Sequence, residues 1–395
     1  MSDKTAIEWT DATWNPTTGC TKVSEGCRHC YAERFTDRFR GVEGHYYSNG
    51  FDVMVRPEKL DMPLRLNRPR KIFVNSTSDL FHDGIPDEYI DQVFAIILAC
   101  AVYEKGHTFQ LLTKRPKRML DYFSGRTPIE LVKAWVKAGT EVVGMAGGTF
   151  LPTFSEAVEW CTGYDWQDHC RDAKGDYKPY EYLDNVWPLP NLWLGVSVEN
   201  QKAADERIPL LLQTPATTRF LSCEPLLGPV DLMRIELGIK KTRGYGERRI
   251  LWDALEAWEF QFSKERTSNI PLASIANDHP RISWVIVGGE SGPKARPMHP
   301  EWVRSLRGQC VDAGVPFFFK QWGEFVSATP QNCEKAIRFV ELDGTDSTEW
   351  TMDRHSLSTA MMARVGKRRA GRVLDGRTWD EFPTQGGITI DTAQP

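Results

Sequence analysis

Short hydrophobic segments recur along the chain, and each ends in polar or glycine-rich residues. They are 71–79 (KIFVNSTSD), 107–116 (HTFQLLTKRP), 191–200 (NLWLGVSVEN), 218–225 (TRFLSCEP), 282–292 (ISWVIVGGESG) and 315–324 (VPFFFKQWGE). Their apolar positions are nearly continuous instead of alternating, which is typical of strands that are buried on both faces of a parallel sheet. The pattern therefore predicts six buried strands.

Helical patterns lie between these strands. Residues 86–106 and 299–314 each begin close to a proline and carry apolar residues at helical spacing. Strand–helix–strand units of this length predict an α/β fold. Two architectures remain open: a partial or full TIM-type (β/α) barrel of parallel strands, or an open doubly wound sheet.

Two intervals between strands are much longer than such a unit requires. They predict helical or irregular insertions at about 120–190 and 233–281, the second with a helix around 250–262 (ILWDALEAWEFQF). After about residue 325 the periodic pattern loosens. We therefore expect an α/β barrel over 1–325 and a C-terminal extension over 326–395.

Polar residues or glycines follow every predicted strand. They are Asn75, Ser76, Thr77, Ser78 and Asp79; Thr113, Lys114 and Arg115; Ser197, Glu199 and Asn200; Ser222 and Glu224; Gly288, Gly289, Glu290 and Ser291; Lys320 and Gln321. In parallel α/β folds the ligand site lies at the carboxyl ends of the strands, whether the sheet is open or closed. We therefore expect a polar site that can take an anionic ligand.

Composition and charge limit the possible classes of protein and its possible cellular location. The chain has 395 residues, a formal net charge of −4 and 41% hydrophobic residues. This argues for a globular protein that contacts any nucleic acid through local patches and not through bulk charge. No run of about 18 apolar residues is present, so we predict no membrane span. The polar N-terminus lacks a signal-peptide core, which favours the cytoplasm, or the host cytoplasm for a phage protein.

Three of the nine cysteines fall within eleven residues, as Cys20-x6-Cys27-x2-Cys30. In a reducing compartment, such a cluster more often binds metal or performs redox chemistry than forms disulfides. One interpretation is chance burial. A second is a zinc site completed by His29 or a distant ligand, although Cys161, His169 and Cys170 lie in an insertion at the wrong spacing.

The third interpretation is a [4Fe–4S] cluster bound by three thiolates. Cluster irons take cysteine thiolates as ligands. Three ligands leave one iron with an open coordination position, just as catalytic metal sites keep one position free. An open iron can bind a substrate or cofactor and pass it one electron, so this interpretation explains why no fourth cysteine is nearby.

Three clustered cysteines ahead of six strand–helix units resemble the radical S-adenosylmethionine (SAM) superfamily. The chain also closely resembles a bacterial and phage-encoded three-cysteine-motif family of poorly defined function. The matching motifs are WNPTTGC, GCRHCYAERF, SDLFHD, LLTKRP, LGVSVEN, CEPLLGPVDL, VGGESGPKARP, PFFFKQWGE and LDGRTWDEFP. The superfamily resemblance implies a partial or fuller barrel whose first strand lies in residues 6–14. It also implies a cluster whose open iron binds SAM, and a 5′-deoxyadenosyl radical that abstracts hydrogen.

The chain departs from the superfamily pattern at two points. The usual spacing is Cys-x3-Cys-x2-Cys, whereas the first gap here has six residues. The Gly-Gly-Glu motif that holds the SAM amino group follows the second strand in the superfamily, but Gly288-Gly289-Glu290 follows the last but one of the six segments here. The resemblance therefore implies that Ser76, Ser78 or Asp79 holds the SAM amino group.

The remaining polar strand ends supply candidates for the ribose and for the substrate. Ser197, Glu199 and Glu224 are candidates for binding SAM, because a carboxylate can accept hydrogen bonds from both ribose hydroxyls. We expect Lys114, Arg115, Glu290 and Lys320 to face the substrate. Basic runs at 113–118 and 363–372 fit a phosphate-bearing substrate.

Two classes of function follow. The first is a radical SAM enzyme that modifies a nucleotide or a phage DNA base, for example by isomerase-type rearrangement in thymidine hypermodification. It would need an external one-electron donor. An enzyme of DNA photolesion repair would share the cofactors and differ in substrate. The second class is a zinc-stabilised protein that binds nucleic acid without catalysis.

Overall fold

A computed structural model describes residues 5–145, 153–162, 186–242, 246–263, 272–275, 280–329, 336–349 and 358–384. The chain divides into two compact units. The first contains 1–22, 32–195 and 214–217, and the second contains 23–31, 196–213 and 218–395. No helix among the described residues is long and apolar enough to span a membrane.

All six predicted strands exist, and they belong to one seven-stranded parallel sheet in the order β1-β4-β5-β6-β7-β12-β13. The strands are β1 (Ala12–Trp14), β4 (Lys71–Val74), β5 (Thr108–Thr113), β6 (Leu192–Ser197), β7 (Thr218–Cys223), β12 (Trp284–Gly288) and β13 (Phe317–Gln321). The expected short first strand is β1, which pairs in parallel with β4. β1 and β13 are the two ends of this order, so the sheet is compatible with a partial barrel, and the full barrel is wrong.

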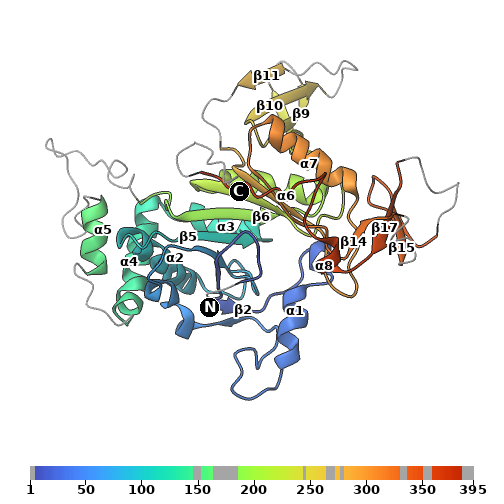
Figure 1. Cartoon of the computed structure of the whole chain (residues 1–395). Helices are drawn as coiled ribbons and strands as arrows, with labels where there is room; N and C mark the ends of the chain where they lie inside the picture. Colours follow the sequence, from blue (N-terminus) through green and yellow to red (C-terminus); the bar gives the residue numbers. More distant parts are fainter. Residues whose placement is uncertain are drawn as a thin grey trace. The chain divides into compact units, whose positions relative to one another are not determined.

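The first unit also contains helices among its described residues. They are α1 (Tyr31–Thr36, its first residue in the second unit), α2 (Asp87–Val102), α3 (Pro116–Ser124), α4 (Pro128–Met145) and α5 (Phe154–Thr162), and a short pair of strands is formed by β2 (Thr17–Thr18) and β3 (Met54–Val55). α2, α4 and α5 lie side by side (Figure 1). Buried Phe94 stacks on Tyr122 and Trp135 at centroid distances of 5.3 and 5.2 Å. Where it is described, the first insertion therefore contains helices α4 and α5, and its residues 186–190 form a turn.

The second unit packs aromatic side chains around β12 and β13. It contains α6 (Gln201–Gln213) and α7 (Pro300–Asp312). Trp284 and Phe318 both contact Phe382, at centroid distances of 5.1 and 5.5 Å. The Phe319 amide donates to the Trp379 carbonyl oxygen over 2.9 Å. The LDGRTWDEFP segment thus lies along the edge of β13 and supplies part of its cover.

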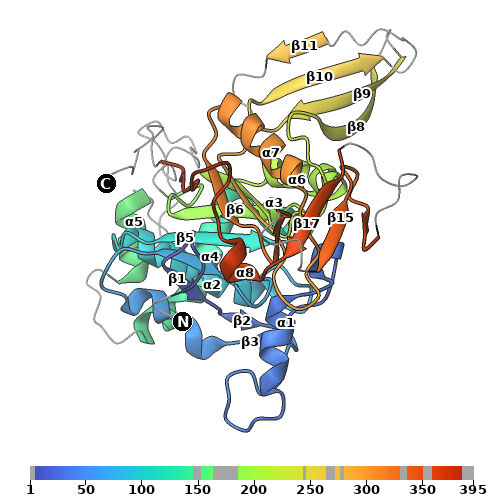
Figure 2. The same ribbon diagram turned by 45° about the vertical axis from the view of Figure 1, so that its right-hand side comes forward.

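The helix predicted around 250–262 is wrong. These residues form two strands of a four-stranded antiparallel sheet: β8 (Ile235–Thr242), β9 (Gly246–Asp253), β10 (Trp258–Ser263) and β11 (Leu272–Ile275) (Figure 2). Asp253 ends β9 because its side-chain oxygen accepts from the amides of Leu255 and Glu256. This Asx turn reverses the chain, and the expected helical stripe is divided between two paired strands.

The C-terminal extension forms a further antiparallel sheet and a short helix. Its elements are β14 (Phe325–Ser327), β15 (Ile337–Val340), β16 (Asp346–Ser347), β17 (Ala360–Arg364) and α8 (Lys367–Ala370). Backbone hydrogen bonds join the residues that precede and follow α8 to the residues that follow β13. Gly366 donates to the Glu324 carbonyl, and Trp322 donates to the Gly371 carbonyl. The extension is therefore anchored at the carboxyl end of β13.

Candidate functional site

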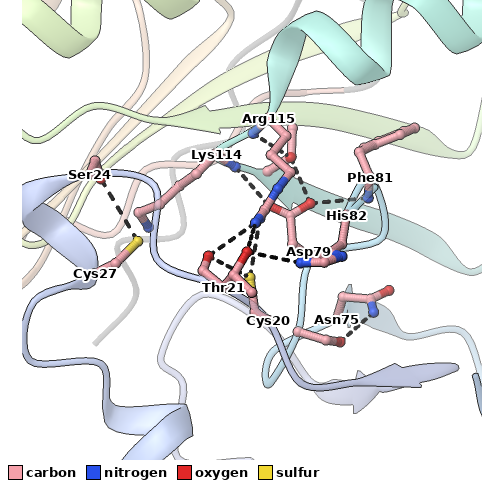
Figure 3. A network of polar contacts seen from close by, with 12 residues as sticks. Cys20, Thr21, Ser24, Cys27, Asn75, Asp79, Phe81, His82, Lys114 and Arg115 are labelled. Carbon is pink, nitrogen blue, oxygen red and sulfur yellow. Dashed lines mark hydrogen bonds and ion pairs between the residues drawn. The ribbon is translucent and has the colours of Figure 1, made fainter. Parts of the chain in front are cut away.

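Cys20 lies in the first unit, where Arg115 contacts its sulfur. Gly19 precedes it at φ 78°, and any side chain on Gly19 would come within 2.0 Å of the Asp52 carbonyl oxygen. Arg115 Nη1 donates to Cys20 Sγ over 3.1 Å, and its Nη2 donates to the carbonyl oxygen and hydroxyl of Thr21 over 3.0 and 2.8 Å (Figure 3). A guanidinium at this distance stabilises negative charge on the sulfur.

Asp79 orients Arg115. Its carboxylate accepts from the Thr113 hydroxyl at 2.7 Å and from the amides of Lys114 and Phe81 at 3.0 and 3.1 Å. Arg115 Nη1 lies 3.4 Å from the same carboxylate, and the two side chains are only 9% and 7% exposed. Burial lowers the pKa of Arg115, but the charges of Asp79 and Cys20 outweigh this effect and raise it overall.

The hydroxyls expected to hold SAM lie at the same strand end. Ser78 donates to the Thr17 carbonyl over 2.8 Å, and Ser76 lies 3.2 Å from the Asn15 side chain. These contacts fix the end of β4 to the segment that leads into Cys20. The structure therefore brings Ser76, Ser78, Asp79, Lys114 and Arg115 together in the first unit.

His82 was not selected from the sequence, although it lies three residues after Asp79 in SDLFHD. Its Nε2 is 2.9 Å from the Thr21 hydroxyl, and its Nδ1 accepts from the Gly84 amide over 3.0 Å. Burial lowers the pKa of His82, and the positive charge of Arg115 lowers it further. The neutral ring with hydrogen on Nε2 therefore fits both contacts.

Cys27 and Cys30 lie in the second unit. The three-residue helical turn Glu25–Cys27 precedes Cys30, and Ser24 Oγ is 3.8 Å from Cys27 Sγ (Figure 3). The same Ser24 hydroxyl donates to Glu199 Oε1 over 2.9 Å. Glu199, chosen as a SAM ligand from the sequence, thus contacts the segment that carries two of the cysteines.

Arg207 on α6 is the counter-ion of Glu199, and sequence analysis missed it. Its Nη1 lies 3.2 and 3.1 Å from the two carboxylate oxygens of Glu199 and also donates to the Ser197 carbonyl over 2.8 Å. The Arg207 and Glu199 side chains are 4% and 2% exposed. No spacing rule in a single sequence pairs an acid at a strand end with a base on the following helix, so the sequence offered no signal for this residue.

A second carboxylate–arginine pair also contacts this segment. Arg296 donates to both oxygens of Glu290, over 2.7 Å from Nη2 and 2.9 Å from Nε. Its Nη2 also donates to the Glu25 carbonyl oxygen over 3.0 Å. Arg296 was also missed, although it lies within the motif VGGESGPKARP that contains Glu290.

Glu224 and Lys320 form a third pair at the ends of β7 and β13. Lys320 Nζ is 2.8 Å from Glu224 Oε2, and Gln321 Nε2 donates to Glu224 Oε1 over 3.0 Å. The side chain of Glu224 is 20% exposed and that of Lys320 is 13% exposed. The second unit thus places Glu224 and Lys320 together. Glu199 contacts Ser24, Glu290 is linked to Glu25 through Arg296, and the Ser197 carbonyl accepts from Arg207.

The cysteines differ in their surroundings. Cys20, Cys27 and Cys30 are partly exposed, whereas three others are buried with raised thiol pKa values because burial disfavours the thiolate, namely Cys100, Cys223 and Cys310. Cys161 is partly exposed on α5. His169 and Cys170 lie outside the described residues. Within the described part of the chain, no three His, Cys, Asp or Glu side chains form a group that could hold a metal ion.

Comparison with known proteins places the chain in a family. No curated protein and no solved structure matches it. A family model described as a protein of unknown function (DUF5131) matches residues 4–383. The chain therefore belongs to the DUF5131 family.

Proposed function

We propose that this protein is a radical SAM enzyme in which Cys20, Cys27 and Cys30 hold a [4Fe–4S] cluster. The observation that carries the proposal is the setting of these thiols: all three are partly exposed, unlike the three buried cysteines, and Arg115 and Ser24 lie beside the sulfurs of Cys20 and Cys27. Cys20 and Cys30 are ten positions apart, and a loop this short can bring all three sulfurs to one cluster. When bound, the cluster would supply one electron, drawn from an external donor, for reductive cleavage of SAM.

Arg115 and Asp79 have distinct roles in this proposal. Arg115 donates to Cys20 Sγ, and hydrogen bonds to ligand sulfurs help to set the reduction potential of a cluster. Asp79 already accepts from three donors besides Arg115, so we assign it to orienting that guanidinium. Second-sphere carboxylates of this kind commonly fix the geometry of the groups around a metal.

Glu224 is our candidate for the SAM ribose. Each of its oxygens accepts from one described side chain, Lys320 or Gln321, and a carboxylate offers about four acceptor positions in total. It is also more exposed than Asp79 or Glu199. It therefore retains the capacity to accept hydrogen bonds from two ribose hydroxyls.

The substrate we propose is phosphate-bearing: a nucleotide or a DNA base, rearranged in an isomerase-type reaction. Support comes from Lys367, Arg368 and Arg369, three consecutive exposed cations on α8. Backbone hydrogen bonds hold α8 beside the residues that follow β13. Such cations fit a phosphate backbone, and a base in a duplex would have to leave the stack before it could react.

The reaction class is tested by purifying the protein without oxygen and reconstituting it with iron and sulfide. We expect about four irons per chain and absorption typical of a cluster. Adding reductant and SAM should then release 5′-deoxyadenosine, measured by chromatography. A protein that binds iron but never cleaves SAM would contradict the enzyme, although not the cluster.

Cys30→Ala separates the proposal from the zinc-stabilised nucleic-acid-binding alternative. In the radical enzyme, Cys30→Ala should lower iron content and abolish SAM cleavage while the fold persists. In the zinc alternative, the wild-type protein is colourless and holds one zinc, and Cys30→Ala destabilises it. Metal analysis and thermal unfolding of both proteins distinguish the outcomes.

A further inference from the structure

Gly26 packs directly against the carboxylate of Glu199. A Cβ atom added to Gly26 would lie 2.4 Å from Glu199 Oε1 and 2.7 Å from its Cδ. Real Cβ atoms do not approach heavy atoms this closely, so only glycine fits. Together with the hydrogen bond from Ser24, this contact seats residues 24–27 on one carboxylate.

Glu199 cannot move aside, because Arg207 holds both of its oxygens in a buried pair. Burying two charges costs desolvation free energy that the pairing offsets only in part. The pair is therefore weak evidence for a gain in stability. It does fix the position of a carboxylate to within a hydrogen-bond length.

A second carboxylate–arginine pair contacts the same segment. Arg296 bridges Glu290 and the backbone carbonyl of Glu25, with contacts of 2.7 and 3.0 Å. Glu290 is 6% exposed and also accepts from the Arg296 amide over 2.7 Å. Two carboxylate–arginine pairs thus contact three consecutive residues, Ser24 to Gly26, directly before Cys27.

We propose that Glu199 and Glu290 are positioning residues for Cys27 and Cys30, not ligands of SAM or substrate. Glu199, held by Arg207, contacts Ser24 and Gly26 directly. Glu290 orients Arg296, which donates to the Glu25 carbonyl, so the two carboxylates together fix the turn that presents the two sulfurs. The purpose of this positioning, to present Cys27 and Cys30 to a cluster, rests on the proposed function. The contacts themselves involve no cofactor.

The test uses the full-length protein without metal and measures amide hydrogen exchange. The amides of Cys27 and Arg28 donate to the carbonyls of Ser24 and Glu25 over 2.9 and 3.1 Å, so their exchange reports the turn. Ser24→Ala should speed their exchange about five-fold, as expected for the loss of one hydrogen bond. Gly26→Ala should speed it more, because the loop must lift away from Glu199.

Three comparisons keep the test specific. Ser24→Thr retains the hydroxyl and should restore slow exchange. Gly308→Ala, on α7, has no atom within 4 Å of the added methyl group and should leave residues 24–31 unchanged. Peptides from α2 should exchange equally in every variant. Unchanged exchange of Cys27 and Arg28 in both Ser24→Ala and Gly26→Ala would overturn the proposal.

Reconstitution with iron and sulfide then tests whether these contacts position the sulfurs of Cys27 and Cys30. If wild-type protein holds iron, Ser24→Ala and Gly26→Ala should lose it faster to a chelator, and Ser24→Thr should not. Equal iron retention in all variants, despite faster loop exchange, would refute the positioning role. If wild-type protein holds no iron, the proposal of a cluster is refuted. Faster exchange in the two variants would still support the role of Glu199 in fixing residues 24–26.

Discussion

Two buried carboxylates meet the cysteine segment in different ways. In the first unit, Asp79 holds Arg115, and the arginine reaches the sulfur of Cys20. In the second unit, Arg207 holds Glu199, and the carboxylate reaches Ser24 beside Cys27. The acid is the support in one case and the contacting group in the other.

The difference follows from the charge of the side chain that contacts the cysteine segment, which is positive for Arg115 and negative for Glu199. Arg115 presents a donor, which can stabilise a thiolate directly, because sulfur accepts hydrogen bonds from cations. Glu199 presents an acceptor, which a thiolate would repel, so it engages a hydroxyl and a glycine backbone instead. One pair therefore acts on the charge of a sulfur, and the other acts on the path of the backbone.

The largest expected effect is that of Glu199→Gln. The change leaves the Arg207 charge buried without a counter-ion, which costs about 3–5 kcal/mol in the free energy of unfolding. Urea unfolding measures it. Glu206→Gln on the exposed face of α6 is the matched control and should change stability by less than about 0.5 kcal/mol. A loss below about 1 kcal/mol for Glu199→Gln would show that the pair is not the rigid support described above.

Asp79→Asn should cost less, about 2 kcal/mol, because the amide keeps one acceptor and removes hydrogen bonds made to a charged group. Arg115 also keeps its two contacts with Thr21. Urea unfolding again measures the loss, with Asp87→Asn, which breaks the more exposed pair with Arg118, as the control. A loss as large as that of Glu199→Gln would remove the distinction between the two regions.

Much of the sheet could be predicted because buried parallel strands leave a continuous apolar signature. All six segments and the short strand before the cysteines are present. The hairpin of β9 and β10 could not be predicted in the same way. Its aromatic residues also satisfy helical spacing, and the turn depends on Asp253, whose role is visible only once its side chain is seen to accept two amides.

Only the acid could be predicted for two of the acid–base pairs at the candidate site. Glu199 and Glu290 were selected because they follow strands, yet Arg207 and Arg296 were not, because they lie in a helix and a loop. Spacing along the chain does not show which residues meet after folding. The contact of Arg115 with Cys20 joins residues 95 positions apart and has no signature in a single sequence.

Arg115→Lys tests the contact of Arg115 with the sulfur of Cys20. Lysine keeps the charge but loses the fork that contacts Cys20 and Thr21 together, so we expect a stability loss of only about 1 kcal/mol. In reconstituted protein the midpoint potential should become more negative, because the lost hydrogen bond stabilised the reduced, more negative state. Redox titration measures it, with Arg126→Lys, the partner of Asp91, as the control. An unchanged midpoint would remove Arg115 from the role proposed for it.

The smallest expected effect is the pH dependence that His82 gives to the first unit. Its pKa is lowered on folding by burial and by Arg115, so the unfolded chain binds its proton more readily than the folded chain. The contribution of His82 to stability is therefore complete above its ordinary pKa of about 6.5 and declines as the pH falls through the lower folded value. His82→Gln, which retains a donor for Thr21, should lose less stability than the wild-type protein between pH 7.5 and pH 5, as measured by urea unfolding. If the two proteins lost stability equally on acidification, another group would control the pH dependence. The neutral His82 ring would then not help to hold Thr21 beside Cys20.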